Sequence, residues 1–341
     1  MRAMVFETAA GPDALKVADR PMPEPGHGEV LVRIGATSLN YRDLLISKGG
    51  YRKRQKQTDL VPLSDGAGTV EAVGPGVTGF KPSDRVTACF FLDWPAGTAT
   101  EHAMESDTGR AVDGMLQEYR VIPVTGLVHT PANLTDAEAA SLTCAGLTAW
   151  SAIVRLGRAE PGDAILTQGT GGVSLFALQF AKMNGCRVAI TSSSDEKLDR
   201  AKALGADHGI NYAATPEWGQ PAHDWAGGDG VDNVVELGGT ETMKQSLIAV
   251  RPGGTLSLIG VLSGATTGNV LLPFIISRDV RLQGVTVGPK DAMQQMCKAI
   301  EVAGMKPVID KVFPFEDAAD AYRHLASGQH FGKVCISVSG D

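Results

Sequence analysis

The chain has 341 residues, a formal net charge of −7 and a hydrophobic fraction of 43%. This length is too great for one ordinary hydrophobic core and suits two domains. The acidic balance argues against nucleic acid or a membrane surface as the main partner, and no apolar stretch is long enough to span a bilayer.

The five cysteines are scattered and contain no CxxC pair. This pattern argues against a disulfide framework and against a four-cysteine zinc lobe. The opening residues, Met1–Glu7, run directly into strand-like sequence without the layout of a signal peptide. We therefore expect a reducing, cytoplasmic setting.

The first part of the chain is predicted to be rich in β-strands. Apolar or alternating runs, separated by Gly and Pro turns, indicate strands at Met1–Phe6, Glu29–Ile34, Thr69–Val73 and Leu116–Val121. Between them, Asp93–Gly114 is polar and shows no clear period. We expect this segment to be a surface excursion or a lid.

Strands and helices alternate from about Thr135 onward. The predicted helices are Asp136–Leu142, Thr148–Val154, Val173–Met183, Glu196–Leu204 and Thr242–Val250, and the predicted strands are Ala164–Thr167, Arg187–Thr191, His208–Asn211, Val231–Glu236 and Thr255–Ile259. Such alternation indicates a parallel sheet with helices on both faces.

The last part, from about Gly288, is predicted to add two helices and two strands, at Asp291–Val302, near Val312, at Phe315–Ala326 and at Lys333–Ser337. The two ends of the chain then form one domain, and the alternating part is inserted between them. We place the boundaries at 1–145 and 288–341 for the first domain and at 146–287 for the second.

The stretch from Ala164 to Ala181 is the most informative part of the inserted domain. An apolar strand leads into Gly169-Thr170-Gly171-Gly172-Val173, and an amphipathic helix follows. The first glycine permits a tight turn, the next lets the backbone approach a pyrophosphate, and the helix N-terminus supplies N–H groups for that anion.

The third position of this glycine fingerprint is Ser174 instead of Gly or Ala. Serine is small, so close packing of the helix on the strand is retained. A plain strand–helix connection is the alternative interpretation. The strand before and the helix after the turn favour a dinucleotide-binding turn.

Several motifs occur together in one order and spacing: Asn40-Tyr41-Arg42-Asp43, Asp65-Gly-Ala-Gly68, Gly79-Phe-Lys-Pro-Ser-Asp84, the Gly169 fingerprint, Ala203-Leu-Gly-Ala-Asp207 and Arg251-Pro-Gly-Gly254. In this combination the chain resembles the medium-chain dehydrogenase/reductase superfamily along nearly its whole length. The resemblance implies an α/β fold: a Rossmann domain with a doubly wound parallel sheet, inserted in a GroES-like β-rich catalytic domain. It also implies an active site in the cleft between the domains.

The resemblance bears directly on zinc. Zinc alcohol dehydrogenases of this superfamily hold a catalytic metal with a Cys, a His followed by Glu, and a later Cys; the corresponding positions here are Asn40, Ser64-Asp65 and Cys144. A catalytic zinc needs about three protein ligands, and one soft ligand with one carboxylate does not supply them. The structural zinc lobe needs four cysteines, and only Cys89 lies in that region. We predict a zinc-free protein in which Cys144 is a small buried residue.

The zinc-free branch resembles quinone oxidoreductases and enoyl or enone reductases. In these enzymes the cofactor delivers hydride to the β-carbon of a C=C conjugated with C=O, and a polar donor supports the enolate in place of a metal. The resemblance implies that Asn40 donates its amide N–H to the carbonyl or the cofactor, that Tyr51 is a proton donor and that Asp43 acts directly.

Each of these three residues has a structural alternative. Asn40 is equally suited to be a turn residue, Asp43 to be a helix-capping carboxylate, and Tyr51 to be a loop residue that covers apolar surface. In addition, Arg52 follows Tyr51 where the family has Pro.

The resemblance also implies NADPH in preference to NADH. Ser192 stands where NAD-binding relatives have an acidic residue for the ribose hydroxyls, and a serine does not repel a 2′-phosphate. Lys197, Tyr212 and Lys333 are implied near the same phosphate. Against this, Asp195-Glu196 opens the next helix and can oppose a phosphate, and Lys197 is also typical of an exposed helix lysine.

Further cofactor contacts are implied at the ends of later strands, at Gly238, Gly260, Val261, Leu262 and Thr286. The apolar segment Asn269–Ile276 is similar to one that pairs across a two-fold axis in this superfamily. It implies a homodimer; an edge strand covered within the chain is the alternative.

The sequence thus predicts an NADPH-dependent oxidoreductase that reduces small-molecule substrates with activated C=C bonds, or quinones, by hydride transfer without zinc. Two alternatives stay open: an alcohol dehydrogenase with an incomplete metal site, and an NADPH-binding protein with little turnover. Aromatic residues in Phe90–Gly114 suit either an apolar ligand or anchorage of the loop.

Overall fold

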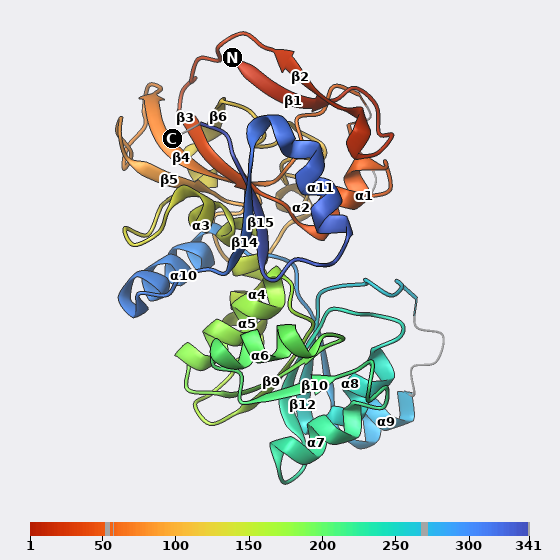
Figure 1. Cartoon of the computed structure of the whole chain (residues 1–341). Coiled ribbons are helices and arrows are strands. Elements are labelled where there is room, and N and C mark those ends of the chain that lie inside the picture. Colours follow the sequence, from red (N-terminus) through yellow and green to blue (C-terminus); the bar gives the residue numbers. More distant parts are fainter. Residues whose placement is uncertain (52–54, 57, 267–271, 340–341) are drawn as a thin grey trace. The chain divides into compact units, whose positions relative to one another are not determined.

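The computed structural model describes residues 1–51, 55–56, 58–266 and 272–339 and divides the chain into two compact units (Figure 1). Unit 1 is formed by both ends of the chain, residues 1–147 and 288 onward, and unit 2 spans 148–287. The boundary lies two residues beyond the one predicted from the sequence.

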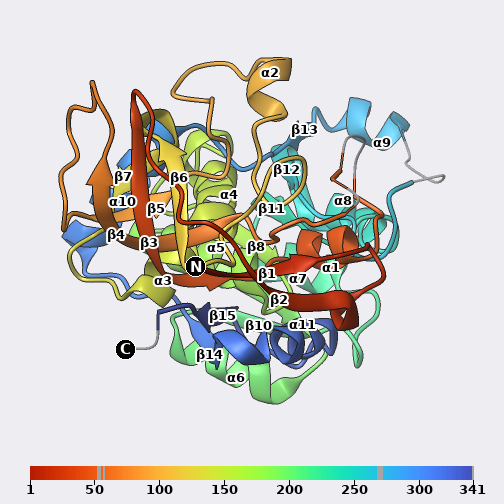
Figure 2. The same ribbon diagram turned by 90° about the horizontal axis from the view of Figure 1, so that it is seen from above.

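Within the described residues, unit 1 has nine strands: β1 (Arg2–Phe6), β2 (Leu15–Asp19), β3 (Glu29–Ser38), β4 (Asp65–Val73), β5 (Arg85–Ala88), β6 (Tyr119–Pro123), β7 (Leu127–His129), β14 (Ile309–Pro314) and β15 (Lys333–Ser337). Seven of them form one sheet in the order β14-β15-β3-β4-β5-β7, with β6 paired to β3, and β1 and β2 form a separate pair. The long strand β3 pairs antiparallel with β4, β6 and β15. The C-terminal strands, blue in Figures 1 and 2, therefore complete a sheet begun by the N-terminal ones.

The helices of unit 1 are α1 (Tyr41–Ser47), α2 (Glu101–Met104), α3 (Asp136–Ala140), α10 (Lys290–Ala303) and α11 (Ala318–Ala326). Helix α11 buries Ala318, Ala321 and Tyr322, whose spacing gives it one apolar face toward the core. Helix α1 was not predicted from the sequence. Its side chains alternate in polarity too irregularly over seven residues to show a helical period.

The inserted unit holds a six-stranded sheet whose members are β8 (Ala164–Gln168), β9 (Arg187–Ser192), β10 (His208–Asn211), β11 (Val231–Glu236), β12 (Val250–Leu258) and β13 (Arg281–Gly284). All neighbouring pairs are parallel, in the order β10-β9-β8-β11-β12-β13. The chain builds outward from β8 to β10 and then returns to continue on the other side with β11. The direction of winding therefore reverses between β8 and β11, which is the switch point where doubly wound sheets bind ligands.

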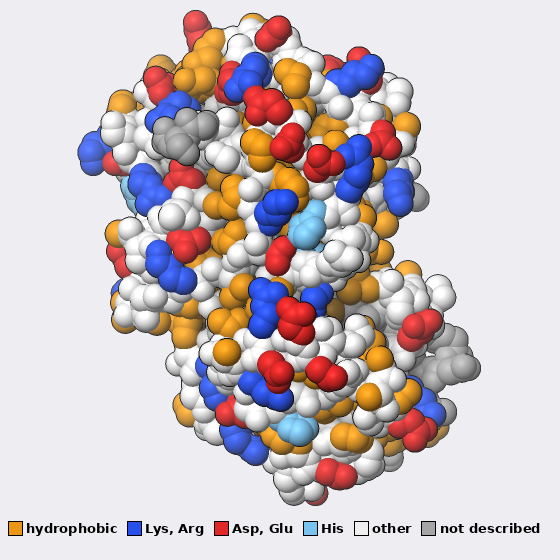
Figure 3. All heavy atoms as spheres, in the orientation of Figure 1, with side chains coloured by type: hydrophobic (Ala, Val, Ile, Leu, Met, Phe, Trp, Pro, Cys, Tyr) orange, Lys and Arg blue, Asp and Glu red, His pale blue; other side chains and the backbone are white. Residues whose placement is uncertain are grey.

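The connecting helices of unit 2 are α5 (Gly172–Met183), α6 (Asp195–Ala203), α7 (Gly219–Ala226), α8 (Met243–Ala249) and α9 (Leu272–Ser277), and α4 (Leu147–Trp150) lies at its boundary. Together the two sheets confirm the predicted class: a doubly wound parallel sheet inserted in a β-rich domain. Among the helices that the structure describes, none combines the length and apolar character needed to cross a membrane. On the face shown in Figure 3, basic and acidic side chains are interspersed.

The prediction of a surface excursion over Asp93–Gly114 was wrong for its second half. Asp107, Thr108 and Arg110 are 1%, 0% and 3% exposed. Arg110 and Arg42 both bind the Asp107 carboxylate, and this pairing lets charged residues enter the interior. At the other end, Phe91 and Trp94 pack edge to face, so these aromatic residues anchor the segment.

Candidate functional site

The glycine-rich turn leads from β8 into α5. Gly169 has φ +73°, a left-handed conformation that glycine adopts without steric cost. Gly171 is the N-cap of α5 and has no side chain to cap it. The N-terminus of this twelve-residue helix therefore presents uncapped N–H groups, which fit a phosphate anion. The structure places Gly169, Thr170, Gly171, Gly172 and Val173 together on this turn.

Ser174 has a structural reason to replace the Gly or Ala of the fingerprint. Its hydroxyl donates to the main-chain carbonyl of Gln168 at 2.5 Å. The N–H of Gly169 also donates to the hydroxyl of Thr191, on β9, at 3.3 Å. The entry to the turn is thus tied to both α5 and β9.

Ser192 and Tyr212 lie together at the carboxyl ends of β9 and β10. The N–H of Tyr212 donates to the Ser192 carbonyl at 3.0 Å. Lys197 belongs to the first turn of α6, where its N–H donates to the hydroxyl of Ser194. The carboxylate of Asp195 accepts from the Asn211 amide at 2.8 Å, so this acidic group is held by a neighbour on β10.

The other implied cofactor positions lie at or beyond the ends of β11, β12 and β13. Gly238 needs to be glycine because a Cβ there would lie 2.3 Å from the Thr242 hydroxyl. Val261 and Leu262 are 50% and 54% exposed after β12. Gly260 precedes them, and Thr286 follows β13. The structure thus brings this group of predicted residues to one edge of the parallel sheet.

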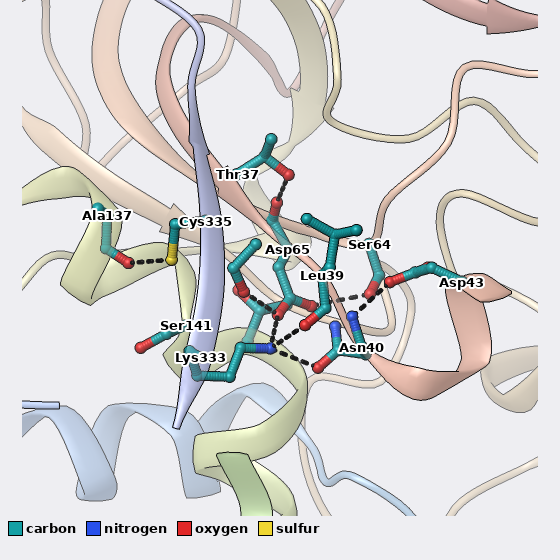
Figure 4. Close-up of polar contacts among 12 residues, drawn as sticks. Thr37, Leu39, Asn40, Asp43, Ser64, Asp65, Ala137, Ser141, Lys333 and Cys335 are labelled. Atoms are coloured by element: carbon teal, nitrogen blue, oxygen red, sulfur yellow. Dashed lines mark hydrogen bonds and ion pairs between the residues drawn. The ribbon is translucent and has the colours of Figure 1, made fainter. Parts of the chain in front are cut away.

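Lys333, in contrast, lies in unit 1, where it opens β15 and is 3% exposed (Figure 4). Its ammonium nitrogen lies 2.6 Å from the Leu39 carbonyl, 2.6 Å from Asn40 Oδ1 and 3.4 Å from Asp65 Oδ2. An ammonium has three donors, and these three acceptors satisfy them. All three of these hydrogen-bonding partners belong to unit 1.

The Asp65 carboxylate that faces Lys333 is fully buried. Its Oδ1 accepts from the Ser64 hydroxyl at 2.8 Å, and its Oδ2 accepts from the Ser38 hydroxyl at 2.7 Å in addition to Lys333. A buried charge needs both an opposite charge and hydrogen bonds, and Asp65 has both. This cluster was missed from the sequence, because Asp65 and Lys333 are far apart along the chain.

The bond from Lys333 fixes the orientation of the Asn40 amide. Because Oδ1 accepts from the ammonium, the other end of the amide must be the NH₂ group. Asn40 Nδ2 is buried and makes no hydrogen bond to any part of the chain that the structure describes. An unsatisfied buried donor is costly to a protein, so this amide is a candidate for binding an acceptor on a ligand.

Asp43 lies one helical turn from Asn40 and caps α1. Its Oδ2 accepts from the Asn40 N–H at 2.7 Å, as in the capping alternative considered from the sequence. Its Oδ1 is buried and has no hydrogen-bonding partner among the described residues. Burial raises the pKa of the Asp43 carboxyl to about 6, while the neighbouring Arg42 guanidinium works in the opposite direction.

Tyr51 is held against a buried guanidinium. The guanidinium carbon of Arg42 lies 5.1 Å from the centre of the Tyr51 ring and 4.6 Å from that of Phe90. Such contacts favour a cation next to the ring face. Arg42 itself binds Asp107 at 2.5 Å. Sequence reasoning missed the Arg42–Asp107 pair because Asp107 lies in the segment expected at the surface; Arg52 lies outside the described residues.

A doubly wound parallel sheet with an anion-binding turn at its switch point defines a nucleotide-dependent enzyme domain, inserted here in a β-rich domain with a buried polar cluster. Comparisons with known proteins agree. Residues 26–132 match the model of the alcohol dehydrogenase GroES-like domain, and residues 172–302 match that of the zinc-binding dehydrogenases. A zinc-type alcohol dehydrogenase-like protein of Schizosaccharomyces pombe is 43% identical over 99% of both chains.

Solved structures agree equally well. An NAD-dependent alcohol dehydrogenase superposes with a TM-score of 0.90 at 35% identity, over 99% of this chain and 100% of the other. The chain therefore belongs to the medium-chain dehydrogenase/reductase superfamily and is an NAD(P)H-dependent oxidoreductase.

The names of other relatives cover several reactions and metal contents. An acryloyl-coenzyme A reductase of Sulfurisphaera tokodaii is 29% identical over 94% of this chain and 96% of its own length. A mycobacterial quinone oxidoreductase has a TM-score of 0.82 at 27% identity, with 99% of each chain covered. An alcohol dehydrogenase of Pyrobaculum aerophilum, solved with cobalt and zinc, has a TM-score of 0.86 at 29% identity, with 99% of each chain covered.

The residues of this chain do not fit a catalytic zinc ion. At the positions that the resemblance assigns to zinc ligands, the ammonium of Lys333 lies within hydrogen-bond distance of Asn40 and Asp65. Cys144, which we predicted to be buried, is partly exposed, and it is the only thiol among these positions. Within the described ranges, no three His, Cys, Asp or Glu side chains gather as metal ligands would.

Proposed function

We propose that this protein reduces activated C=C bonds or quinones with NADPH and without zinc. The observation that carries the proposal is the Asn40 amide, whose NH₂ group is buried and unpartnered while Lys333 fixes its orientation. A fixed N–H donor suits a substrate whose carbonyl oxygen gains negative charge during the reaction. The relatives named acryloyl-coenzyme A reductase and quinone oxidoreductase support this substrate class.

When bound, the nicotinamide supplies the hydride. The residues of this chain then bind the carbonyl of the substrate and supply the proton. Asn40 Nδ2 donates to the carbonyl oxygen, and Tyr51 supplies the proton that reaches the α-carbon. Asp43 holds the Asn40 main chain through the N–H bond, so its first role is to position the donor.

The donor role of Asn40 is tested by Asn40→Asp. Aspartate keeps an oxygen for Lys333 but removes the N–H donor, so we expect kcat to fall by about 100-fold with a smaller change in KM. The measurement is steady-state oxidation of NADPH with the best substrate of a panel. Asn133→Asp, which changes a partly buried amide that binds the Met305 carbonyl, is the matched control. An Asn40→Asp enzyme with native kcat would refute the role.

The reaction class is tested by a panel of enones, quinones and aldehydes, with the metal content measured on the same preparation. Turnover of enones or quinones by metal-free protein supports the proposal. Turnover of aldehydes alone, lost on chelation, favours the alcohol dehydrogenase alternative. Tight NADPH binding without turnover of any member favours a binding protein.

A reducing, cytoplasmic setting, which we also propose, is supported by five free cysteines.

A further inference from the structure

A buried carboxylate is hydrogen-bonded to the residue that precedes the glycine-rich turn. Glu236 ends β11 and is 1% exposed. Its Oε1 accepts from the N–H groups of Gly238 and Gly239, both at 2.9 Å, and from the Thr242 hydroxyl at 2.5 Å. Its Oε2 accepts from the Gln168 amide at 2.8 Å and from the Ser246 hydroxyl. The carboxylate thus receives five hydrogen bonds.

Gln168 joins this carboxylate to the turn. It ends β8 and immediately precedes Gly169. Its Oε1 accepts from the N–H groups of Leu237 and Gly238 at 3.0 and 3.1 Å. Its Nε2 donates to Glu236 and also to the Ser246 hydroxyl, each at 2.8 Å. The side chain is 7% exposed, so water does not substitute for these contacts.

The two residues bridge the place where the sheet changes its direction of winding. β8 and β11 are neighbouring parallel strands, and Gln168 and Glu236 are their last residues. The bridge therefore ties the turn after β8 to the turn after β11, which is the edge where a dinucleotide is bound in this class of sheet. Its hydrogen bonds have a fixed direction: the amide donates across the bridge and the carboxylate only accepts.

We propose that Glu236 and Gln168 are positioning residues that hold residues 169–173 in the conformation that receives the cofactor's phosphates. This proposal rests on the assignment of that turn to the cofactor. The uncapped N–H groups of α5 bind an anion well only if the turn keeps them pointed at one place. With the bridge broken, the entry to the turn is free to shift, and affinity for the cofactor falls.

Glu236→Gln breaks the bridge without a change in side-chain size. In one orientation the new amide NH₂ faces the NH₂ of Gln168; in the other it faces the N–H groups of Gly238 and Gly239. Turning Gln168 over only moves the conflict to Leu237 and Gly238. One buried donor is therefore always unpaired, and we expect the dissociation constant of NADPH to rise at least about tenfold. The constant is measured by fluorescence titration of purified protein without substrate.

The exchange variant Gln168→Glu/Glu236→Gln is the decisive measurement. It restores the bridge with its direction reversed: the new amide at 236 donates to the carboxylate at 168, which also accepts from Leu237 and Gly238. We expect its dissociation constant for NADPH to return to within about threefold of the native value. Gln168→Glu alone places two carboxylates face to face and should bind NADPH at least as weakly as Glu236→Gln.

Controls separate positioning of the turn from general stability. Asp224→Asn removes an exposed carboxylate of the same unit and should leave the dissociation constant unchanged. A lower midpoint of thermal unfolding with a native dissociation constant in Glu236→Gln would overturn the proposal, and so would an exchange variant that binds no better than Glu236→Gln. If Glu236→Gln does not fold, Ser246→Ala and the exchange variant decide: weakened binding in the former and native binding in the latter support the bridge, and any other pair of results overturns it.

The titration needs no substrate, so its result is independent of the substrate panel. If the variants follow these expectations but the native protein reduces no enone or quinone, the proposal about the bridge stands and the proposed reaction is refuted. Conversely, if Glu236→Gln binds NADPH as the native protein does and enones are reduced, the proposed reaction stands and the proposal about the bridge is refuted.

Discussion

Ser192 is the single residue on which the choice between the two nicotinamide cofactors depends most directly. It ends β9, is 4% exposed, and its hydroxyl accepts from the Ser194 N–H at 3.2 Å. An acidic side chain at this position binds the ribose hydroxyls of NAD and repels a 2′-phosphate. We propose that the native serine permits NADPH.

Ser192→Asp is therefore expected to reverse the preference. The new carboxylate can still accept from the Ser194 N–H, so the loop is retained, but its charge opposes the phosphate of NADPH. The ratio of kcat/KM for NADPH to that for NADH should fall by about 100-fold, which corresponds to about 2.7 kcal/mol. Ser192→Asn, of similar size and without charge, is the control. An unchanged ratio in Ser192→Asp would show that the phosphate is recognised elsewhere.

The sequence located residues whose partners are near in the chain and missed those whose partners are distant. Gly169 and Ser192 are recognisable because the turn and the strand that carry them are local patterns. Lys333 binds Asp65 and Asn40, and these contacts depend on the pairing of β15 with β3; its expected place near the cofactor phosphate stays a prediction. No local pattern states which strand will pair with which, so the cluster could not be predicted.

At the scale of a single element, α1 shows how a short helix carries two candidate site residues. Asn40 is its N-cap and Asp43 closes the cap from the first turn. The cap places the Asp43 carboxylate in the interior, where Oδ1 finds no partner among the described residues. The sequence offered catalysis and capping as alternatives for Asp43; the capping contact is present, and a catalytic role stays a prediction.

The burial of Asp43 predicts a pH dependence of stability. Burial raises the pKa of this carboxyl to about 6 from 3.8, so the folded protein binds the proton more tightly than the unfolded chain. The stabilisation is then fully present below pH 3.8 and is lost as the pH rises through 6. Between pH 5 and 7.5 the loss amounts to about 1 kcal/mol in the free energy of unfolding.

Asp43→Asn should remove this dependence, because asparagine stays neutral and can accept from the Asn40 N–H with its oxygen. The measurement is urea unfolding of the native and variant proteins at both pH values. As the pH rises from 5 to 7.5, the free energy of unfolding of the variant should increase by about 1 kcal/mol relative to that of the native protein. Glu301→Gln, an exposed carboxyl of unit 1, should give no such gain. Parallel pH profiles for Asp43→Asn and the native protein would contradict the expectation.

At the scale of the whole molecule, the division into two units could be predicted from the sequence, because the alternation of strands and helices continues over a long part of the chain. Strands and helices alternate through most of the inserted part, and its central strands β8 and β11 are largely buried, as parallel strands covered on both faces are. The strand pairing that completes unit 1 was harder to predict from the sequence. It depends on β14 and β15 returning to β3, and on Asp107 and its arginine partners being drawn into the interior.

Unit 2 also has an apolar edge, and we propose that a second copy of the chain covers it. Helix α9 exposes Leu272 and Ile276 by 63% and 78%, and the edge strand β13 exposes Leu282 by 40%. Asn269–Leu271, which belong to the same predicted segment, lie outside the described residues. An unpaired edge strand beside exposed apolar side chains invites pairing with another chain, and a two-fold axis makes such an edge complementary to itself.

The native protein is therefore expected to have a mass in solution of about twice its chain mass of 35.7 kDa, as measured by light scattering after gel filtration. Ile276→Glu should shift it to the single-chain mass, because the interface would bury an unpaired carboxylate. Val302→Glu, at a side chain of α10 that is 82% exposed, should stay dimeric. Native protein at the single-chain mass, or an Ile276→Glu variant that stays dimeric, would show that this edge is not the interface and that its apolar side chains are covered by another means.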